Sequence, residues 1–544
     1  NTAVGQNSLS ANTTGASNAA VGKDSLKLNT TGASNVAVGN VALDANTSGS
    51  QNTALGDAAL GSTTTSDCNT AVGANALFKN TTGTNNTAMG VDAALCNTTG
   101  DGNTAVGQNS LRLNTTADNN TAVGIQSLDA NTEGHSNTAV GKGSLGANTT
   151  ADNNVAVGFN ALTDNTTGAA NTAVGQTALA TNTTGADNVA VGKGALTANT
   201  TGAENIAVGS GVLTANTAGA NNIGVGDRAL LANTTGDCTV AIGYKALAAN
   251  TTADFNIGIG ACSSLANTTG TANVAMGAFS LFTSTTGDNN VAIGHDALFC
   301  NNGSSADCNT AVGFKAMCKN TTGINNVGIG ISAMQENTTG ADNAAVGRRS
   351  LIANTTGLRN VAVGSLALDA NTTGDDHTAV GMDALGDMTT GGCNTGLGRY
   401  AGSEITTGSN NSAIGFNAQA SAVDATNEVT LGDGNINNLR CNDTSISGLS
   451  DERDKKNIED IPHGLEYILA LRPVKFDWNT RDGTRKGKKD YGFIAQELDK
   501  VETDFGSAEY TRLVHKDNPE KWEADVMKTY PILIKAIQEL KAEI

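Results

Sequence analysis

The sequence predicts a mainly β fold, in which a long β-solenoid or β-roll shaft of 17-residue coils is followed by a small α+β domain. The first observation behind this prediction is a repeat. Glycines recur every 17 residues from Gly5 to Gly294 and, after a two-residue insertion, from Gly313 to Gly432, which gives 26 coils. A fixed period of this length is typical of stacked architectures, in which each repeat buries its apolar residues against its neighbours.

The second observation is an abrupt change in composition near residue 450. All four prolines and both tryptophans follow this position, and all nine cysteines precede it. The last periodic glycine is Gly432, and the period decays over the residues that follow. We therefore expect the shaft to occupy residues 1–434, a junction 435–449 and a separate C-terminal domain 450–544.

Each coil contains a short segment that predicts a β-strand. The unit reads N-T/V-A-V-G-x-x-A-L-x-x-N-T-T-G-x-x, as in the coil that starts at Asn154. The residue before the glycine is always Val, Ile, Leu or Met, and the one before that is Ala or Gly in every copy except Thr430. This alternation gives one branched apolar face and one nearly bare face. Because a bare face lets another backbone approach closely, we expect lateral association of the shaft through the Ala/Gly face.

The rest of the unit predicts a second short strand and two turns. The second apolar pair, Ala76-Leu77 in one copy, supplies the strand. The N-T-T-G stretch supplies a turn, in which Gly is available for positive φ and Asn and Thr can bond nearby backbone. We expect the repeated Asn to form hydrogen-bonded ladders from coil to coil. Two alternatives remain open: N-T-T is a glycosylation acceptor in secreted eukaryotic proteins, and ranks of Thr on a flat β-face can order ice-like water.

The composition argues against several functions for the shaft. Aromatic residues make up 3% of the chain and charged residues 15%, so the coils lack the bulky side chains of a large enzyme core. The scattered rings, such as Tyr244, Phe255 and Phe279, are interpreted as rim residues, and no aromatic cluster identifies a sugar site. The net charge of −19 argues against nucleic acid as a partner, because phosphate binding needs clustered Lys and Arg. No run of about 20 apolar residues occurs, so we expect no membrane insertion.

We also expect no bound metal and no other cofactor. The nine cysteines are irregularly spaced and form no paired metal signature. Small buried thiols are the expectation for most of them. Cys300, Cys308 and Cys318 flank the insertion and are close enough in sequence to pair.

Four blocks of the C-terminal region carry a resemblance to a known family. They are residues 450–458, 471–478 with L-R-P-V-K-F-D-W, 491–498 with Y-G-F-I-A-Q-E-L, and 536–540 with A-I-Q-E-L. In this order they resemble the intramolecular chaperone domain of endosialidase tail spikes, a self-cleaving module that ends many phage fibres and occurs in a myelin regulatory factor. The coils resemble the head repeats of trimeric autotransporter adhesins and the N-T-A-V-G arrays of phage fibres. This resemblance implies a parallel homotrimer, whereas the periodicity alone would also allow a monomeric solenoid.

The resemblance to the chaperone family implies a single autoproteolytic cut by a Ser–Lys pair. In its S-D-x-R-x-K motif, Ser450 would be the nucleophile, Lys455 the general base, and the bond between Leu449 and Ser450 the cleavage site. Asp451 and Arg453 match the motif as supporting residues. A serine hydroxyl needs a base within hydrogen-bond reach, and a lysine can serve if burial lowers its pKa. We expect this single-turnover Ser–Lys endopeptidase to be the chain's one enzymatic activity, with no turnover enzyme in the shaft.

Two features of the motif leave other interpretations open. Position 454 usually carries an apolar residue in such motifs and here carries Asp, an acid that could hold the proton of the neighbouring base. Without the family, Ser-Asp before a charged run would predict a helix N-cap.

The end of the chain predicts a helix with a coiled-coil stripe. Six apolar residues are spaced 4-3-4-3-4, namely Val526, Tyr530, Leu533, Ile537, Leu540 and Ile544. Pro531 should lie in the first turn of this helix. With a fibre attached, we expect three-stranded association through the stripe, although a short amphipathic helix can also pack only on its own domain.

These features predict a structural tail fibre or receptor-binding fibre shaft of a virus, of the kind found in tailed phages. The expected location is the extracellular virion. The expected partners are two further copies of the chain, a host cell-surface receptor with polysaccharide as the default, and other virion tail proteins. Those tail proteins would bind a missing N-terminal region, because the chain begins at Asn1 without Met and is interpreted as a fragment or processed form.

Two other classes remain open at this point. A bacterial surface adhesin of similar trimeric build, including an ice-binding variant, would place the chain at a cell surface. A glycan-degrading tail spike is the weakest class, because the coils leave no room for paired carboxylates in a cleft.

Overall fold

The structure is a computed structural model that describes residues 1–303, 306–436, 440, 450–479, 486–516 and 522–543. Two compact units, Asn1–Asn343 and Ala344–Ile544, make up the chain and are described in turn. Within the described residues, no helix is long and apolar enough to cross a membrane.

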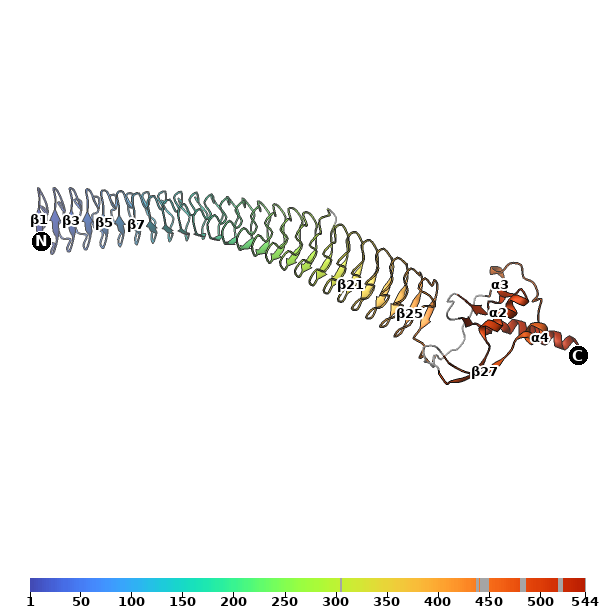
Figure 1. The fold of residues 1–544 in the computed structure, drawn as a ribbon. Coiled ribbons are helices and arrows are strands. Elements are labelled where there is room, and N and C mark those ends of the chain that lie inside the picture. Colours follow the sequence, from blue (N-terminus) through green and yellow to red (C-terminus); the bar gives the residue numbers. More distant parts are fainter. Residues whose placement is uncertain (304–305, 437–439, 441–449, 480–485, 517–521, 544) are drawn as a thin grey trace. The chain divides into compact units, whose positions relative to one another are not determined.

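One three-residue strand in each coil builds the first unit, and Figure 1 shows these strands following one another along it. The predicted β-solenoid of 17-residue coils is therefore confirmed. The strands are β1 (Thr2–Val4), β2 (Ala19–Val21), β3 (Val36–Val38), β4 (Thr53–Leu55), β5 (Thr70–Val72), β6 (Thr87–Met89), β7 (Thr104–Val106), β8 (Thr121–Val123), β9 (Thr138–Val140), β10 (Val155–Val157), β11 (Thr172–Val174), β12 (Val189–Val191), β13 (Ile206–Val208), β14 (Ile223–Val225), β15 (Val240–Ile242), β16 (Ile257–Ile259), β17 (Val274–Met276), β18 (Val291–Ile293), β19 (Thr310–Val312) and β20 (Val327–Ile329).

Neighbouring strands of this unit pair in parallel with equivalent residues opposite each other. Thr2 lies opposite Ala19, and the same 17-residue offset continues along the coils. Between β18 and β19 the offset becomes 19, with Val291 opposite Thr310. The two-residue insertion is therefore absorbed outside the strands, and the ladder keeps its register across it.

The interior of each coil is formed by the small residues of the strands, contrary to the prediction of lateral association through an Ala/Gly face. Ala37, the middle residue of β3, is fully buried beside Ala42 and Leu43, whereas the flanking Val36 is exposed. The coil is too narrow for a larger side chain at the middle position. Where Gly258 takes this place, an added Cβ would lie 3.0 Å from Cγ of Leu247. The bare face therefore approaches the chain's own coil, and the branched residues face outward.

The second apolar segment is not a strand, which corrects another prediction. Val41 has φ of +50° and Leu43 has φ of +51°, and the equivalent residues of other coils are also left-handed. Alternating left-handed residues curl the backbone into successive turns, so that Leu43 points inward. The backbone N of Leu43 still donates to the carbonyl of Ala59 in the next coil at 3.1 Å, so the segment remains bonded from coil to coil.

The glycine of N-T-T-G lies in a crowded place and does not have a positive φ; a small side chain such as that of Ala117 replaces it in some coils. A Cβ on Gly32 would lie 2.3 Å from the carbonyl oxygen of Gly49 and 2.5 Å from Oδ1 of Asn29. The left-handed residue of this turn is Ser34, with φ of +59°. The positive φ that sequence reasoning assigned to Gly32 belongs instead to the glycine after the strand, such as Gly39 with φ of +146°.

Asparagine ladders run along the inside of the coils, as predicted. Asn46 Nδ2 donates to Oδ1 of Asn29 at 2.8 Å and to the carbonyl of Gly49 at 3.0 Å. A second ladder forms at the asparagine before each strand, where the backbone N of Asn35 donates to Oδ1 of Asn18 at 2.9 Å. Because an amide can both donate and accept, most of these buried polar groups are satisfied from coil to coil. Among the described residues, Oδ1 of Asn46 has no partner, since Thr63 replaces asparagine at the next position of its ladder.

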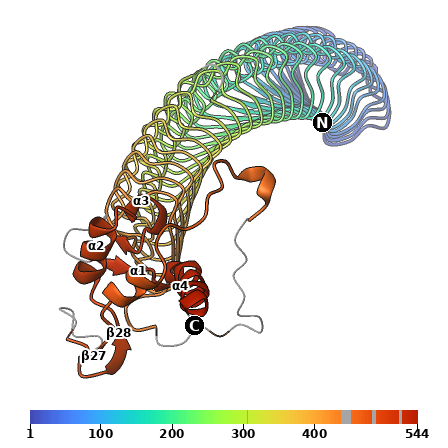
Figure 2. The same cartoon turned by 90° about the vertical axis from the view of Figure 1, so that its right-hand side faces the viewer.

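The second unit begins with further coils and ends in a small α/β region (Figures 1 and 2). Its coil strands are β21 (Ala344–Val346), β22 (Val361–Val363), β23 (Thr378–Val380), β24 (Thr395–Leu397), β25 (Ser412–Ile414) and β26 (Val429–Leu431). The later elements are η1 (Glu452–Asp454), α1 (Leu465–Ala470), β27 (Val474–Asp477), β28 (Lys489–Gly492), α2 (Ala495–Asp504), α3 (Ala508–Thr511), β29 (Val514–His515), β30 (Glu523–Ala524), η2 (Val526–Lys528) and α4 (Thr529–Glu543).

A small apolar core holds the α/β region together. Tyr467 of α1, Leu498 of α2, Leu513 and Ile532 of α4 are buried against one another. The backbone N of Leu465 donates to a carboxylate oxygen of Glu539 at 2.7 Å, which satisfies a free amide at the start of α1. Helices α1 and α4 are thus joined by both apolar packing and a polar bond.

Candidate active site

A single tight turn brings the hydroxyl of Ser450 and the amine of Lys455 together. Oδ1 of Asp451 caps η1 by accepting a hydrogen bond from the backbone N of Arg453 at 2.9 Å. The backbone N of Lys455 then donates to the carbonyl of Glu452 at 3.1 Å. After this turn, Lys455 Nζ lies 2.7 Å from Ser450 Oγ and 3.4 Å from the carbonyl oxygen of Ser450. The two groups are within the reach that a nucleophile and its base require.

Asp451 and Arg453 hold this turn and do not touch the serine hydroxyl. Arg453 Nε lies 3.0 Å from Oδ1 of Asp451, and Nη2 lies 2.5 Å from Oδ2. The guanidinium lowers the pKa of the Asp451 carboxyl below its usual value, so the cap stays ionised. The N-cap that the Ser-Asp pair predicts is therefore supplied by Asp451, and the Ser450 hydroxyl meets Lys455.

The pair lies at the surface of the single chain. Ser450 and Lys455 are both exposed. Among the ion pairs of the described residues, none joins Asp454 to Lys455. The expected cleavage site is described on its Ser450 side alone, because Leu449 lies outside the described residues. Within those residues, no three His, Cys, Asp or Glu side chains are placed to hold a metal ion.

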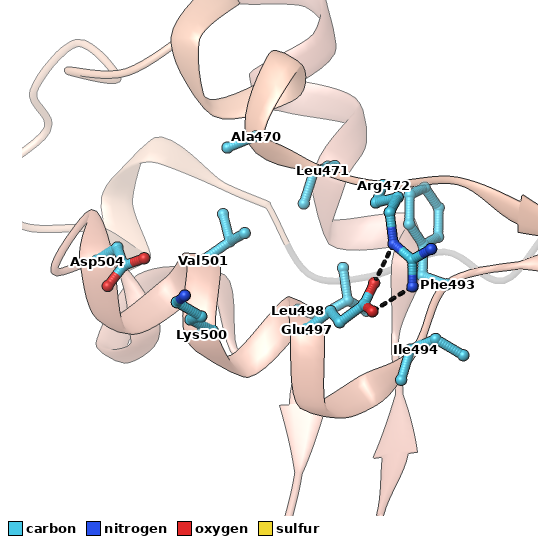
Figure 3. Close-up of a pocket in the computed structure, with 10 residues that line it drawn as sticks. All are labelled: Ala470, Leu471, Arg472, Phe493, Ile494, Glu497, Leu498, Lys500, Val501 and Asp504. Atoms are coloured by element: carbon cyan, nitrogen blue, oxygen red, sulfur yellow. Dashed lines mark hydrogen bonds and ion pairs between the residues drawn. The ribbon is translucent and has the colours of Figure 1, made fainter.

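A second charged pair joins two of the motif blocks, and sequence reasoning gave it no role. Arg472 follows α1 and Glu497 lies in the first turn of α2, where Arg472 Nε donates to Glu497 Oε2 at 2.8 Å (Figure 3). The other guanidinium nitrogen bonds the second carboxylate oxygen, which makes the pair bidentate. The pair lowers the pKa of Glu497 and closes one end of a hollow lined by Leu498 and Val501. Opposite charges in two separate blocks were the signal that could have identified it.

Helix α4 presents the predicted stripe to solvent. Pro531 is its third residue and therefore lies in the first turn, as predicted. Ile532 and Ala536 are buried on the domain's own core side. The stripe residues that lie within α4 are exposed, namely Tyr530, Leu533, Ile537 and Leu540, while Ile544 lies outside the described residues. One face of the helix therefore packs on its own domain and the other remains uncovered.

The cysteines differ from the prediction of small buried thiols. In the described part of the chain all are free, and each is exposed or half-buried. The backbone N of Cys300 donates to the carbonyl of Cys318 at 2.9 Å, so these two residues are neighbours on successive coils. Partial burial raises the pKa of the Cys318 thiol to about 11. Cys441 lies outside the described residues.

Phe279, interpreted from the sequence as one of the scattered rim residues, belongs to a cluster of rings. Five rings on three successive coils contact one another: Phe279, Phe282, His295, Phe299 and Phe314. The period itself was the available signal, because Phe282 and Phe299 are 17 residues apart and therefore occupy equivalent positions on adjacent coils.

The two parts of the chain define a class of protein, a repetitive β-solenoid that carries a small C-terminal domain with a Ser–Lys pair at its start. Residues 450–507 match the family described as "Chaperone of endosialidase", which confirms the resemblance for this segment. The β-solenoid and this domain together fit a tail fibre with a C-terminal chaperone domain, and the family implies trimeric assembly. No curated protein and no solved structure matches the chain.

Proposed function

We propose that the chain is the shaft of a viral tail fibre, trimerised by a C-terminal chaperone that cleaves itself off between Leu449 and Ser450. In this proposal the fibre is extracellular, attached to the virion, and reaches a receptor on the host surface. The observation that carries it is the 2.7 Å contact between Lys455 Nζ and Ser450 Oγ inside a domain that matches the chaperone family.

The cleavage chemistry needs only these two side chains and water. Lys455, as a neutral amine, removes the proton from Ser450 Oγ while the oxygen attacks the carbonyl carbon of residue 449. The peptide nitrogen of Ser450 takes this proton from Lys455, leaves the carbon and becomes an amine, so an ester to Oγ replaces the amide. Water then hydrolyses the ester to a carboxylate on residue 449 and restores the hydroxyl of Ser450, now the first residue of the released domain.

The exposure of Ser450 and Lys455 in the single chain supports autoproteolysis that follows trimer formation. A lysine in open water keeps its proton, and it becomes a base where water is excluded. Both Ser450 and Lys455 are exposed in the single chain. Neighbouring subunits would supply the missing cover, so that the chain is cut only after three copies have come together.

Two uncovered apolar surfaces support the trimer. The first is the stripe on α4 that contains Leu533 and Ile537. The second runs along the coils, where the outward residue before the strand glycine is apolar and often exposed, as in Val21, Leu55, Met89, Val191, Val208, Ile242, Met276, Ile293 and Ile329. Since this second stripe repeats with every coil, a partner that covers its length must have the same period, as another copy of the chain has.

Denaturing electrophoresis of the purified full chain tests the proposal. Wild type should lose a fragment of about 95 residues, the length of 450–544. Ser450→Ala and Lys455→Ala should remain whole, because the first removes the nucleophile and the second its base. Lys456→Ala changes the adjacent exposed lysine and should be cut as wild type is.

Light scattering on the same samples tests trimer formation separately from autoproteolysis. Trimeric wild type that stays whole would contradict autoproteolysis and leave the chaperone role standing. A monomeric wild type would contradict both.

A further inference from the structure

Five aromatic rings form one continuous surface on three successive coils of the first unit; we call them the aromatic patch. Phe282 and Phe299 stack with ring centroids 4.9 Å apart and an interplanar angle of 11°. Phe279 meets Phe282 and His295 edge-on, at 5.6 and 5.7 Å. His295 in turn lies 5.9 Å from Phe314. The rings thus span the coils whose strands are β17, β18 and β19.

The patch is a local departure from the repeat. Of the eight phenylalanines in residues 1–434, four lie within residues 279–314. The coil before the patch carries Ala261, and the first coil of the patch carries Ala278, at the position that holds His295 and Phe314 in the next two coils. A feature confined to three of 26 coils is not needed to stack them, because the other coils stack without it.

The rings also do not contribute to the packing of the coil interior. Ala297 and Leu298 fill the inside of the same coil and are fully buried. Phe279 and Phe314 remain 37% and 47% exposed, and Phe282 and Phe299 are half-buried. Contiguous exposed apolar surface of this kind marks a place where another molecule binds.

Several polar and charged side chains border the patch. His295 Nδ1 lies 3.1 Å from a carboxylate oxygen of Asp296, and Lys319 is paired with Glu336. Nζ of Lys315 lies 5.3 Å from the centre of the Phe314 ring, in a cation–π contact. A ligand would therefore meet mainly ring surface, on a chain whose net charge is −19. This net charge disfavours an acidic ligand.

We propose that the aromatic patch binds a neutral polysaccharide of the host surface. The C–H faces of neutral hexopyranoses lie against aromatic rings, and their hydroxyl edges bond polar groups at the rim such as Asp296. Rings on successive coils offer several such contacts to one linear chain. This inference rests on the proposed function, since a fibre that attaches to a surface needs a site for it.

A second copy of the chain is the competing occupant, and the position of the patch disfavours it. The apolar stripe that repeats on every coil lies on the strands, as at Met276 and Ile293. The patch residues lie on the segment after the strand glycine, as His295 follows Gly294. A contact between copies that repeats along the coils would use the first surface.

Native affinity electrophoresis of the full chain, in gels that contain dextran, galactomannan or, as an acidic comparison, alginate, tests the inference. Wild type should be retarded by at least one neutral polysaccharide and not by alginate. Phe314→Ala and the double variant Phe282→Ala/Phe299→Ala should weaken that retardation about tenfold or more, since stacked aromatic side chains dominate such contacts. Phe159→Ala is the matched control, because Phe159 is also 47% exposed and lies outside the patch.

Thermal unfolding and light scattering on the same proteins keep the outcomes distinct. The patch variants should unfold as wild type does, because their rings point away from the coil interior. Loss of the trimer in these variants would assign the patch to a contact between copies and overturn the inference. No retardation of trimeric, cleaved wild type by either neutral polysaccharide would also overturn it, while leaving the proposed assembly and cleavage intact.

Discussion

At the scale of the residue, what fits inside a coil is decided by the coil on either side. Asparagine recurs there because its amide can donate to one neighbour and accept from the other, as Asn29 does between Asn12 and Asn46. His377 interrupts one of these ladders. Its backbone N donates to Oδ1 of Asn360 at 3.0 Å, and its Nδ1 accepts from the backbone N of Asn394 at 3.2 Å. The ring is fully buried.

This histidine should make the stability of its coils depend on pH. Burial lowers the pKa of His377 below its ordinary value of 6.5. The unfolded chain therefore binds the proton more readily than the folded one, and stability is lost as pH falls through about 6.5 toward the folded pKa. We expect the thermal midpoint of wild type to fall relative to that of His377→Asn between roughly pH 7 and 5, measured by circular dichroism.

A second variant tests the same pH dependence by adding a histidine. Asn394→His places a second imidazole in the same ladder and should steepen the loss of stability in acid. Parallel midpoint curves for wild type and His377→Asn would show that the buried ring does not titrate with folding.

The ladders could be predicted from the sequence. The orientation of the strands was predicted wrongly, and there is a definite physical reason for the error. An amide that both donates and accepts suits a stack whatever the shape of the coil, so the role of Asn29 could be inferred. The inward direction of Ala37 could not, because alternation identifies two faces and not which of them is inside. The left-handed φ of Leu43 was equally hidden, since a leucine rarely adopts this conformation.

At the scale of the element, spacing was a better guide than residue type. The five-residue separation of Ser450 and Lys455 spans one capped 3-10 turn, and the turn returns the lysine to the serine. The motif did not indicate that the pair is exposed to solvent, because exposure depends on which segments pack over the turn. For the Arg472–Glu497 pair the sequence offered opposite charges in two blocks, but the contact itself depends on how the segment after α1 meets α2 in space.

The exposed stripe of α4 gives an element-scale prediction. Ile537→Asp should raise the dissociation constant of the trimer at least about a hundredfold, because a charge would be buried without a partner at a coiled-coil position. Since Ile537 is exposed in the single chain, the variant domain should still fold. Analytical ultracentrifugation measures the first effect and circular dichroism the second.

The adjacent position supplies a control for this experiment. Gln538→Asp adds the same charge to an exposed residue outside the stripe and should leave the trimer unchanged. If cleavage follows assembly, Ile537→Asp should also slow the release of the C-terminal fragment. A fully trimeric Ile537→Asp variant would show that α4 packs only on its own domain.

At the scale of the whole molecule, the repeat creates a problem of register. A strand such as β10 pairs with equivalent residues on either side, and the ladder bonds reappear with every 17 residues. Three copies of such a shaft that slipped by one coil would recover nearly all contacts along their length. The insertion near Cys308 is one internal reference for the register, and the C-terminal domain, which has no repeat, is another. Bringing three C-termini together first would set the register before the coils associate.

Refolding should therefore depend on whether the chaperone is still attached. Ser450→Ala keeps the domain covalently joined and should recover trimers after denaturation in guanidinium chloride and dilution. Cleaved wild type, freed of the domain, should recover on the order of tenfold fewer, because slipped pairings become kinetic traps that nothing removes. Size exclusion with light scattering counts the trimers, and limited proteolysis tests their register. Equal yields from both proteins would mean that the coils find their register unaided.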